Sequence, residues 1–145
     1  MHVNLFRYGG VYVAVLVALI VVGWLLARFT SVGIPSGLNT VLPPMMAALM
    51  EGQAMAKRSG VMMPSGAMWR SAVAMTAVVA AINMVILFGL SMIPGFADLF
   101  NAIGFGLLGG IFLFLLVMVF FTNRIFLWFG QRNTLKTTDV RVLKK

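Results

Sequence analysis

Long apolar runs alternate along this chain with short polar or proline-containing stretches. A bilayer core of about 30 Å needs about 20 apolar residues in a helix. Four segments meet that length, at about residues 8–27, 38–56, 69–93 and 103–121. The fourth segment can extend to Phe129 without meeting a proline. The pattern therefore predicts an all-α polytopic membrane protein with four transmembrane helices.

The second segment is the least regular of the four because it contains Pro43 and Pro44. Proline removes a backbone hydrogen bond and collides with the preceding turn, so we expect this helix to be kinked or to start late. If the segment were re-entrant instead, three crossings would leave the amino terminus outside. We expect four crossings.

The distribution of basic residues predicts the orientation. With four crossings, ten of the eleven Lys and Arg residues lie on one side and Arg28 lies alone on the other. The positive-inside rule then places both termini in the cytoplasm. Residues 1–129 form a single transmembrane domain, and residues 130–145 form a basic cytoplasmic tail that anchors the topology or lies on anionic lipid.

Composition narrows the class of function. The 145 residues are 61% hydrophobic and 10% charged, against roughly 25% charged in a soluble domain. The chain has no cysteine and one histidine, at position 2, so we expect no cofactor or metal. The basic residues lie outside the apolar runs, which does not fit a groove for nucleic acid. The lipid bilayer is the expected partner.

Small residues recur every four positions in three of the segments, which places them on one helix face. Such faces let helix backbones approach closely. We expect them to pack within one bundle, with self-association as the alternative. The stripes are Gly10, Ala14 and Ala18; Ala72, Thr76 and Ala80; and Ala102, Gly106 and Gly110.

Two polar residues lie inside the apolar part of the chain. Glu51 comes six residues before Lys57 and seven before Arg58, and Arg70 begins the next helix. We expect Glu51 to form an ion pair at the membrane boundary with Arg58 or Arg70. The alternative is a protonatable site on an ion path. Asn83, near the middle of the third segment, is expected to hydrogen-bond to a neighbouring helix.

No arrangement of residues indicates an enzyme. There is no Ser-His-Asp set, no pair of carboxylates with a plausible shared site and no phosphate-binding loop. The twelve methionines could bind Cu(I), but methionine is also a flexible apolar filler of helices.

The stretch 47–72 resembles the central signature of an uncharacterised family of small bacterial inner-membrane proteins with four predicted helices. The matching positions are Gly52, Gln53, Arg58, Gly60, Pro64, Trp69 and Arg70. The chain departs from that family at Ala67 and Met68, where an acidic residue often precedes the tryptophan. The resemblance implies a bacterial cytoplasmic membrane location and no known activity.

These observations predict a non-catalytic accessory or interaction protein, bound to a larger membrane complex or protecting against a membrane-directed toxin. The alternative is a small oligomeric transporter or channel with Glu51 and Asn83 along its route. The candidate polar sites, functional or structural, are Glu51, Gln53, Arg58, Trp69, Arg70 and Asn83.

Overall fold

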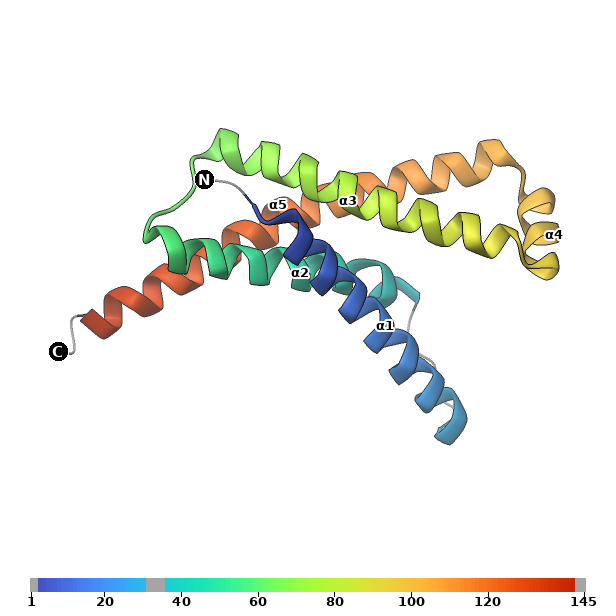
Figure 1. The fold of residues 1–145 in the computed structure, drawn as a ribbon, viewed down its shortest axis with the longest axis horizontal. Helices are drawn as coiled ribbons and strands as arrows, with labels where there is room; N and C mark the ends of the chain where they lie inside the picture. Colours follow the sequence, from blue (N-terminus) through green and yellow to red (C-terminus); the bar gives the residue numbers. More distant parts are fainter. Residues whose placement is uncertain (1–2, 31–35, 143–145) are drawn as a thin grey trace.

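The computed structural model describes residues 3–30 and 36–142, and all of its regular structure in these ranges is helical (Figure 1). The all-α class is therefore confirmed. The helices in chain order are α1 (Leu5–Phe29), α2 (Ser36–Ser59), α3 (Ser65–Ser91), α4 (Pro94–Ile103) and α5 (Phe105–Val142).

Three of the described helices are long and apolar enough to cross a membrane: α1, α3 and residues 105–137 of α5. These three helices are compatible with the predicted membrane-spanning class. Helix α2 has the length but not the apolar composition, so the prediction of four transmembrane helices is not confirmed.

Helix α2 lies in the middle of the molecule, in contact with both α1 and α5 (Figure 1). It begins at Ser36, before both prolines, so the expected late start is wrong. One face is buried, and its residues come in adjacent pairs four positions apart. Packing of this face offsets the backbone hydrogen bonds that the prolines cannot make. The buried residues are Pro43, Pro44, Ala47, Ala48, Glu51, Gly52, Met55 and Ala56.

Helices α3 and α5 run antiparallel, and the short helix α4 joins them at one end (Figure 1). Pro94-Gly95 is a turn signal in the sequence, at the end of the third apolar segment. Pro94 is instead at the start of α4, where its missing N–H has no intrahelical partner to lose. Gly104 separates α4 from α5 with φ +81°, a conformation that glycine adopts without strain.

Helix α5 is 38 residues long, about 57 Å at about 1.5 Å per residue, which exceeds the bilayer core. Residues 130–142, predicted as a tail, continue this helix. Gly130 and Gln131 are buried, and their packing extends the helix beyond the apolar run.

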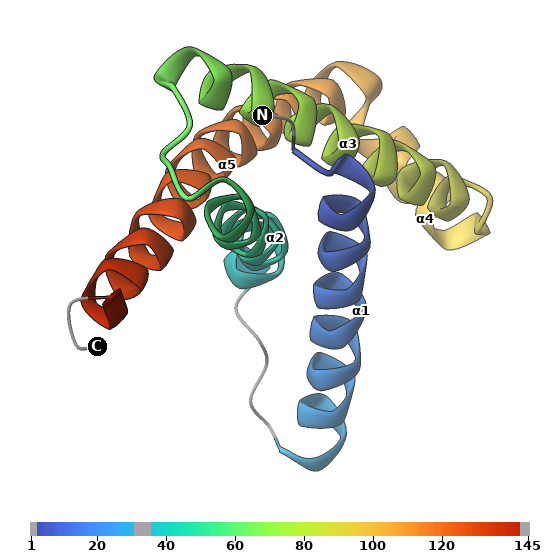
Figure 2. The same ribbon diagram turned by 60° about the vertical axis from the view of Figure 1, so that its left-hand side comes forward.

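The core occupies one end of the molecule, which we call the packed end. Burial stops at Tyr12 in α1 and at Val79 in α3, and in α5 it begins only at Val119. Beyond these points α1 diverges from α3, as Figures 1 and 2 both show. We call the remainder of α1, α3 and α5, together with α4, the open end. None of its described residues is buried.

The small-residue stripes divide between the two ends. Ala72 is buried and Thr76 and Ala80 are half-buried, so this stripe packs within the chain as expected. The stripes of α1 and of the α4–α5 region are exposed, and a Cβ added at Gly10, Gly106 or Gly110 would have nothing within 4 Å. For these two stripes the expected internal packing is wrong, because no described part of the chain covers them.

Candidate functional site

A cavity of about 190 Å³ lies between the first turns of α1 and the carboxyl-terminal half of α2. It lies at the packed end, and its charged lining residues are Arg7 of α1 and Glu51 and Lys57 of α2. Its lining combines charged, polar and apolar side chains: Arg7, Tyr8, Val11, Ala47, Met50, Glu51, Gln53, Ala54 and Lys57.

Glu51 forms the buried wall of this cavity, with 1% of its surface exposed. Its Oε2 accepts hydrogen bonds from Nε and Nη2 of Arg7, at 2.8 and 2.5 Å. Its Oε1 accepts from the backbone N–H of Asn4 at 2.9 Å. Both carboxylate oxygens are thus satisfied, as a buried charge requires.

The same contacts attach α2 to the start of α1. Asn4 is the N-cap of α1, and its side chain accepts a hydrogen bond from the backbone N–H of Arg7. Negative charge is favourable near a helix N-terminus, where backbone N–H groups lack partners. Glu51 therefore completes the cap as well as the ion pair.

The expected partners of Glu51 were the wrong ones. Arg58 is two helical turns further along α2, about 10 Å along the axis, and it is exposed. Arg70 is exposed on α3. Arg7 comes from a different helix at the same level. The start of one helix and the end of the next lie at the same end of a helical hairpin, which brings Arg7 near Glu51. Spacing along one helix does not single Arg7 out among the basic residues.

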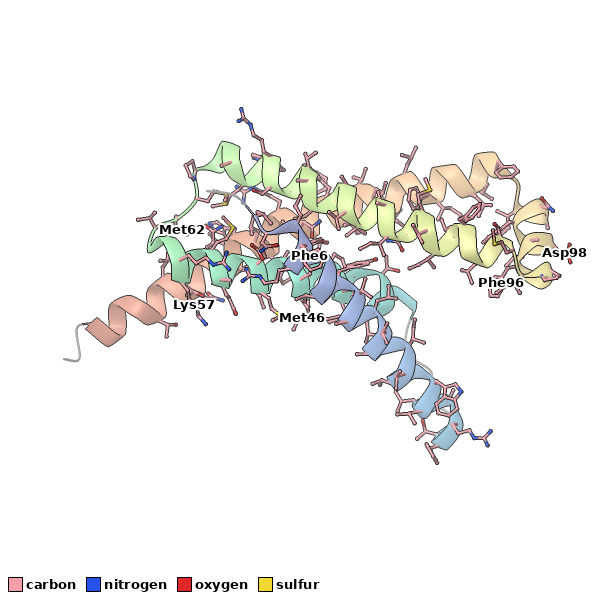
Figure 3. All side chains as sticks on the ribbon, in the orientation of Figure 1. Phe6, Met46, Lys57, Met62, Phe96 and Asp98 are labelled. Carbon is pink, nitrogen blue, oxygen red and sulfur yellow. The ribbon has the colours of Figure 1, made fainter. Side chains whose placement is uncertain are left out.

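The cavity also presents polar groups that are not used by the described parts of the chain. Lys57 is exposed and forms no ion pair with any described residue (Figure 3). The side-chain amide of Gln53 and Nη1 of Arg7 have no hydrogen-bond partner among the described residues. Two cations and one carboxylate leave the cavity with one net positive charge.

A close crossing of α2 and α5 holds Glu51 in place. A Cβ added at Gly52 would lie less than 3.0 Å from the backbone oxygen of Leu127, and one at Gly130 equally close to that of Leu49. Real Cβ atoms essentially never approach so closely. The spacing of Ala48, Gly52 and Ala56, small residues four positions apart, is a signal for this crossing in the sequence.

The other predicted sites lie away from the cavity. Asn83 Nδ2 donates to the hydroxyl oxygen of Tyr12 and to the carbonyl of Val79, both at 2.9 Å, so it joins α3 to α1 as expected. Trp69 lies 5.5 Å from the ring of Phe120 and 5.0 Å from the guanidinium of Arg124. With Arg70 it forms part of the surface of the α3–α5 pair.

Two buried polar residues were missed. The hydroxyl of Tyr8 donates to Asn123 Oδ1 at 2.7 Å, and Asn123 Nδ2 donates to Thr76 Oγ1 at 3.2 Å, so one amide connects three helices. Gln131 Oε1 accepts from the backbone N–H of Met63 at 2.9 Å. Asn123 and Gln131 come after residues 103–121, the apolar run of the fourth segment. Polar residues are expected to be exposed there, so the sequence does not indicate that these two are buried.

Comparisons with protein-family models, with curated proteins and with solved structures found no match to this chain. The family resemblance of residues 47–72 stays a prediction. The geometry itself indicates a preorganised, positively charged cavity beside a structural ion pair, and an exposed apolar surface at the other end.

Proposed function

We propose that this protein is a multi-pass protein of the bacterial cytoplasmic membrane that serves as a non-catalytic accessory subunit. It crosses the membrane four times, with both termini in the cytoplasm. The exposed small-residue stripe of α1 and the open end bind another membrane protein, and the packed end holds the helices together at the cytoplasmic side.

The exposed stripe on α1 is the observation that carries this proposal. Gly10, Ala14 and Ala18 share one face and are all exposed. A helix that contacts only lipid gains nothing from small residues at this spacing, since lipid tails adapt to any apolar side chain. A helix that contacts another helix gains close backbone approach and dispersion contacts. The equivalent stripe on α3 packs in this way.

The arrangement of charge supports the orientation. Lys57 and Arg58 end α2, and Arg7 begins α1, so these cations lie at the packed end. Arg28 ends α1 and Asp98 lies on α4, at the open end (Figure 3). The positive-inside rule then favours the packed end as the cytoplasmic one.

The burial of α2 supports a fourth crossing despite its modest apolar composition. Its carboxylate and both prolines face α1 and α5 and not the surrounding medium. Polar groups within membrane segments are tolerated when neighbouring helices enclose them.

The accessory function fits the geometry better than the transporter alternative. Both oxygens of Glu51 are bonded to α1, and the amide of Asn83 is bonded to Tyr12 and Val79. These groups act within the chain and are not offered to a permeant ion.

Native mass spectrometry of the full chain, extracted gently from its own membrane, tests the accessory function. We expect a defined heteromeric mass. We expect Gly10→Ile to reduce that complex about tenfold or more, because its side chain prevents close approach of the partner helix. Gly66→Ile is the matched control, since that exposed glycine on α3 also has nothing within 4 Å and does not lie at the open end.

Two results would contradict the accessory function. A monomer from the native membrane would remove the partner, and a homo-oligomer would favour the transporter. Equal loss of the complex in both glycine variants would show that the α1 stripe is not the binding face.

A further inference from the structure

We propose that the cavity between α1 and α2 binds the phosphodiester headgroup of an anionic membrane lipid, with Arg7 and Lys57 on the phosphate. The inference rests on the proposed orientation, with the packed end at the cytoplasmic surface, and is independent of any protein partner at the open end.

The donors of the cavity suit a phosphodiester. Glu51 holds the guanidinium of Arg7 through Nε and Nη2, which leaves Nη1 without a partner among the described residues. The guanidinium is therefore already oriented when a ligand arrives. Lys57 and the amide of Gln53 supply further donors from α2. Guanidinium and ammonium groups are the side chains that bind phosphate oxygens most strongly.

The charge of the cavity selects a singly charged anion. Arg7 and Lys57 oppose one carboxylate, which is itself fully bonded, so one positive charge is unmatched. A phosphodiester carries one negative charge. A zwitterionic headgroup would bring an ammonium group next to Lys57 with no free carboxylate to receive it.

The apolar lining and the size of the cavity indicate that it holds the headgroup of a lipid whose acyl chains remain outside. Val11, Ala47, Met50 and Ala54 complete the wall, and Met50 is 48% exposed at its edge. The volume of about 190 Å³ is below the ~300–1,000 Å³ of pockets that enclose whole small molecules. A phosphate and its glycerol fit this description, with the acyl chains against the exposed apolar face of α1.

In the proposed topology, the cavity lies at the ends of the apolar runs, which is the level of the lipid phosphates in the membrane. Arg7 is the last charged residue before the apolar run of α1, and Lys57 follows the uncharged residues after Glu51 in α2. Basic pockets between transmembrane helices at the cytoplasmic surface are suited to anionic headgroups.

The test is a lipid titration of the full chain in mild detergent, followed by native mass spectrometry. The probes are phosphatidylglycerol, phosphatidylethanolamine and inorganic phosphate. We expect phosphatidylglycerol to bind more tightly than phosphatidylethanolamine. We expect Lys57→Gln to weaken phosphatidylglycerol binding about fivefold, the effect of about one basic residue at a membrane surface.

Arg58→Gln is the matched control, because it removes the same charge from an exposed neighbouring residue that does not line the cavity. We expect it to change binding less than twofold, because Arg58 does not line the cavity and water and salt screen its charge. Lys57 and Arg58 are both exposed, and we expect neither substitution to change the melting temperature. A melting temperature equal to that of the unmodified protein will show that a variant is folded.

Three outcomes would overturn the inference. Equal weakening by the two variants would mean a diffuse attraction of charge and not a site. Equal binding of the two lipids would remove the selectivity for anions. Displacement of the lipid by millimolar inorganic phosphate would make a free anion, and not the lipid, the ligand.

Discussion

The carboxylate of Glu51 is bonded on both oxygens, and this explains how a charge can be buried in this protein. An unpaired charge in such a place is expensive, while a pair with good geometry recovers much of that cost through short hydrogen bonds. Asn4 and Arg7 supply this geometry from one helical turn. Glu51 is best explained as a structural residue that also orients Arg7.

Replacing Glu51 by Gln should destabilise the purified protein by about 2 kcal/mol. Loss of one partner of a fully buried pair costs about 3–5 kcal/mol, and Arg7 is 34% exposed, which reduces the effect because water can solvate the released guanidinium. Thermal or denaturant unfolding in detergent measures the change.

Arg58→Gln is the control, and it should change stability by less than about 0.5 kcal/mol because Arg58 is exposed. If Glu51→Gln were as harmless as this control, the ion pair would contribute nothing to the fold.

At the residue scale, the sequence predicted the role of Glu51 but not its partner. An isolated acid in an apolar run implies a nearby cation, and several basic residues were candidates. The choice of Arg7 depends on how the helices are arranged, which spacing along one helix does not encode. Asn83 was predictable because its mid-segment position makes exposure to lipid costly. Asn123 was not, because it lies where the apolar run gives way to polar residues.

The crossing of α2 and α5 is the central contact between elements. Gly52 and Gly130 allow the two backbones to approach so closely that neither position has room for a methyl group. In a membrane, where burial of apolar surface from water does not drive helix association, this contact supplies the dispersion energy. It also fixes the face of α2 that carries Glu51.

Substituting alanine at Gly52 should destabilise the protein by about 1–3 kcal/mol, because the added methyl group collides with backbone and not with a movable side chain. Gly130→Ala should behave in the same way. The unfolding midpoint in detergent is the measurement.

Gly110→Ala is the control for helix propensity, since its Cβ meets nothing within 4 Å. That change should be neutral or stabilising by about 0.5–1 kcal/mol. A Gly52→Ala protein as stable as Gly110→Ala would contradict the close crossing.

Helix existence was largely predictable from the apolar runs, while helix boundaries were not. The four long helices coincide with the four segments, but α2 includes both prolines and α5 continues through thirteen residues predicted as a tail. In both cases tertiary packing of one face outweighs local propensity. Helix α4 was missed because Pro94-Gly95 is a turn signal, although proline is also common in the first turn of a helix.

The whole molecule is organised as a packed end and an open end. Polar contacts among α1, α3 and α5, together with the ion pair from α2, lie at the packed end. The open end exposes apolar side chains, the stripe of the α4–α5 region, and Ala14 and Ala18 of the α1 stripe. The lipid site that we propose lies at the packed end, and the open end belongs to the surface that we propose for a partner protein.

The proposed topology has a direct consequence for this division. Arg7, at the start of α1, pairs with Glu51 in the carboxyl-terminal half of α2. Four crossings place both groups at the cytoplasmic surface. A re-entrant α2 would instead place the start of α1, with Arg7, on the outside.

Cysteine labelling on intact cells tests this topology most directly, because the chain has no cysteine of its own. Phe6→Cys, Arg58→Cys and Asp98→Cys each introduce one exposed thiol. With a membrane-impermeant maleimide, four crossings predict labelling of Asp98→Cys alone, and labelling of all three after the cells are opened. Labelling of Phe6→Cys from outside intact cells would contradict the account. Together with Asp98→Cys it would mean that α2 does not cross the membrane, and together with Arg58→Cys it would mean that the orientation is reversed.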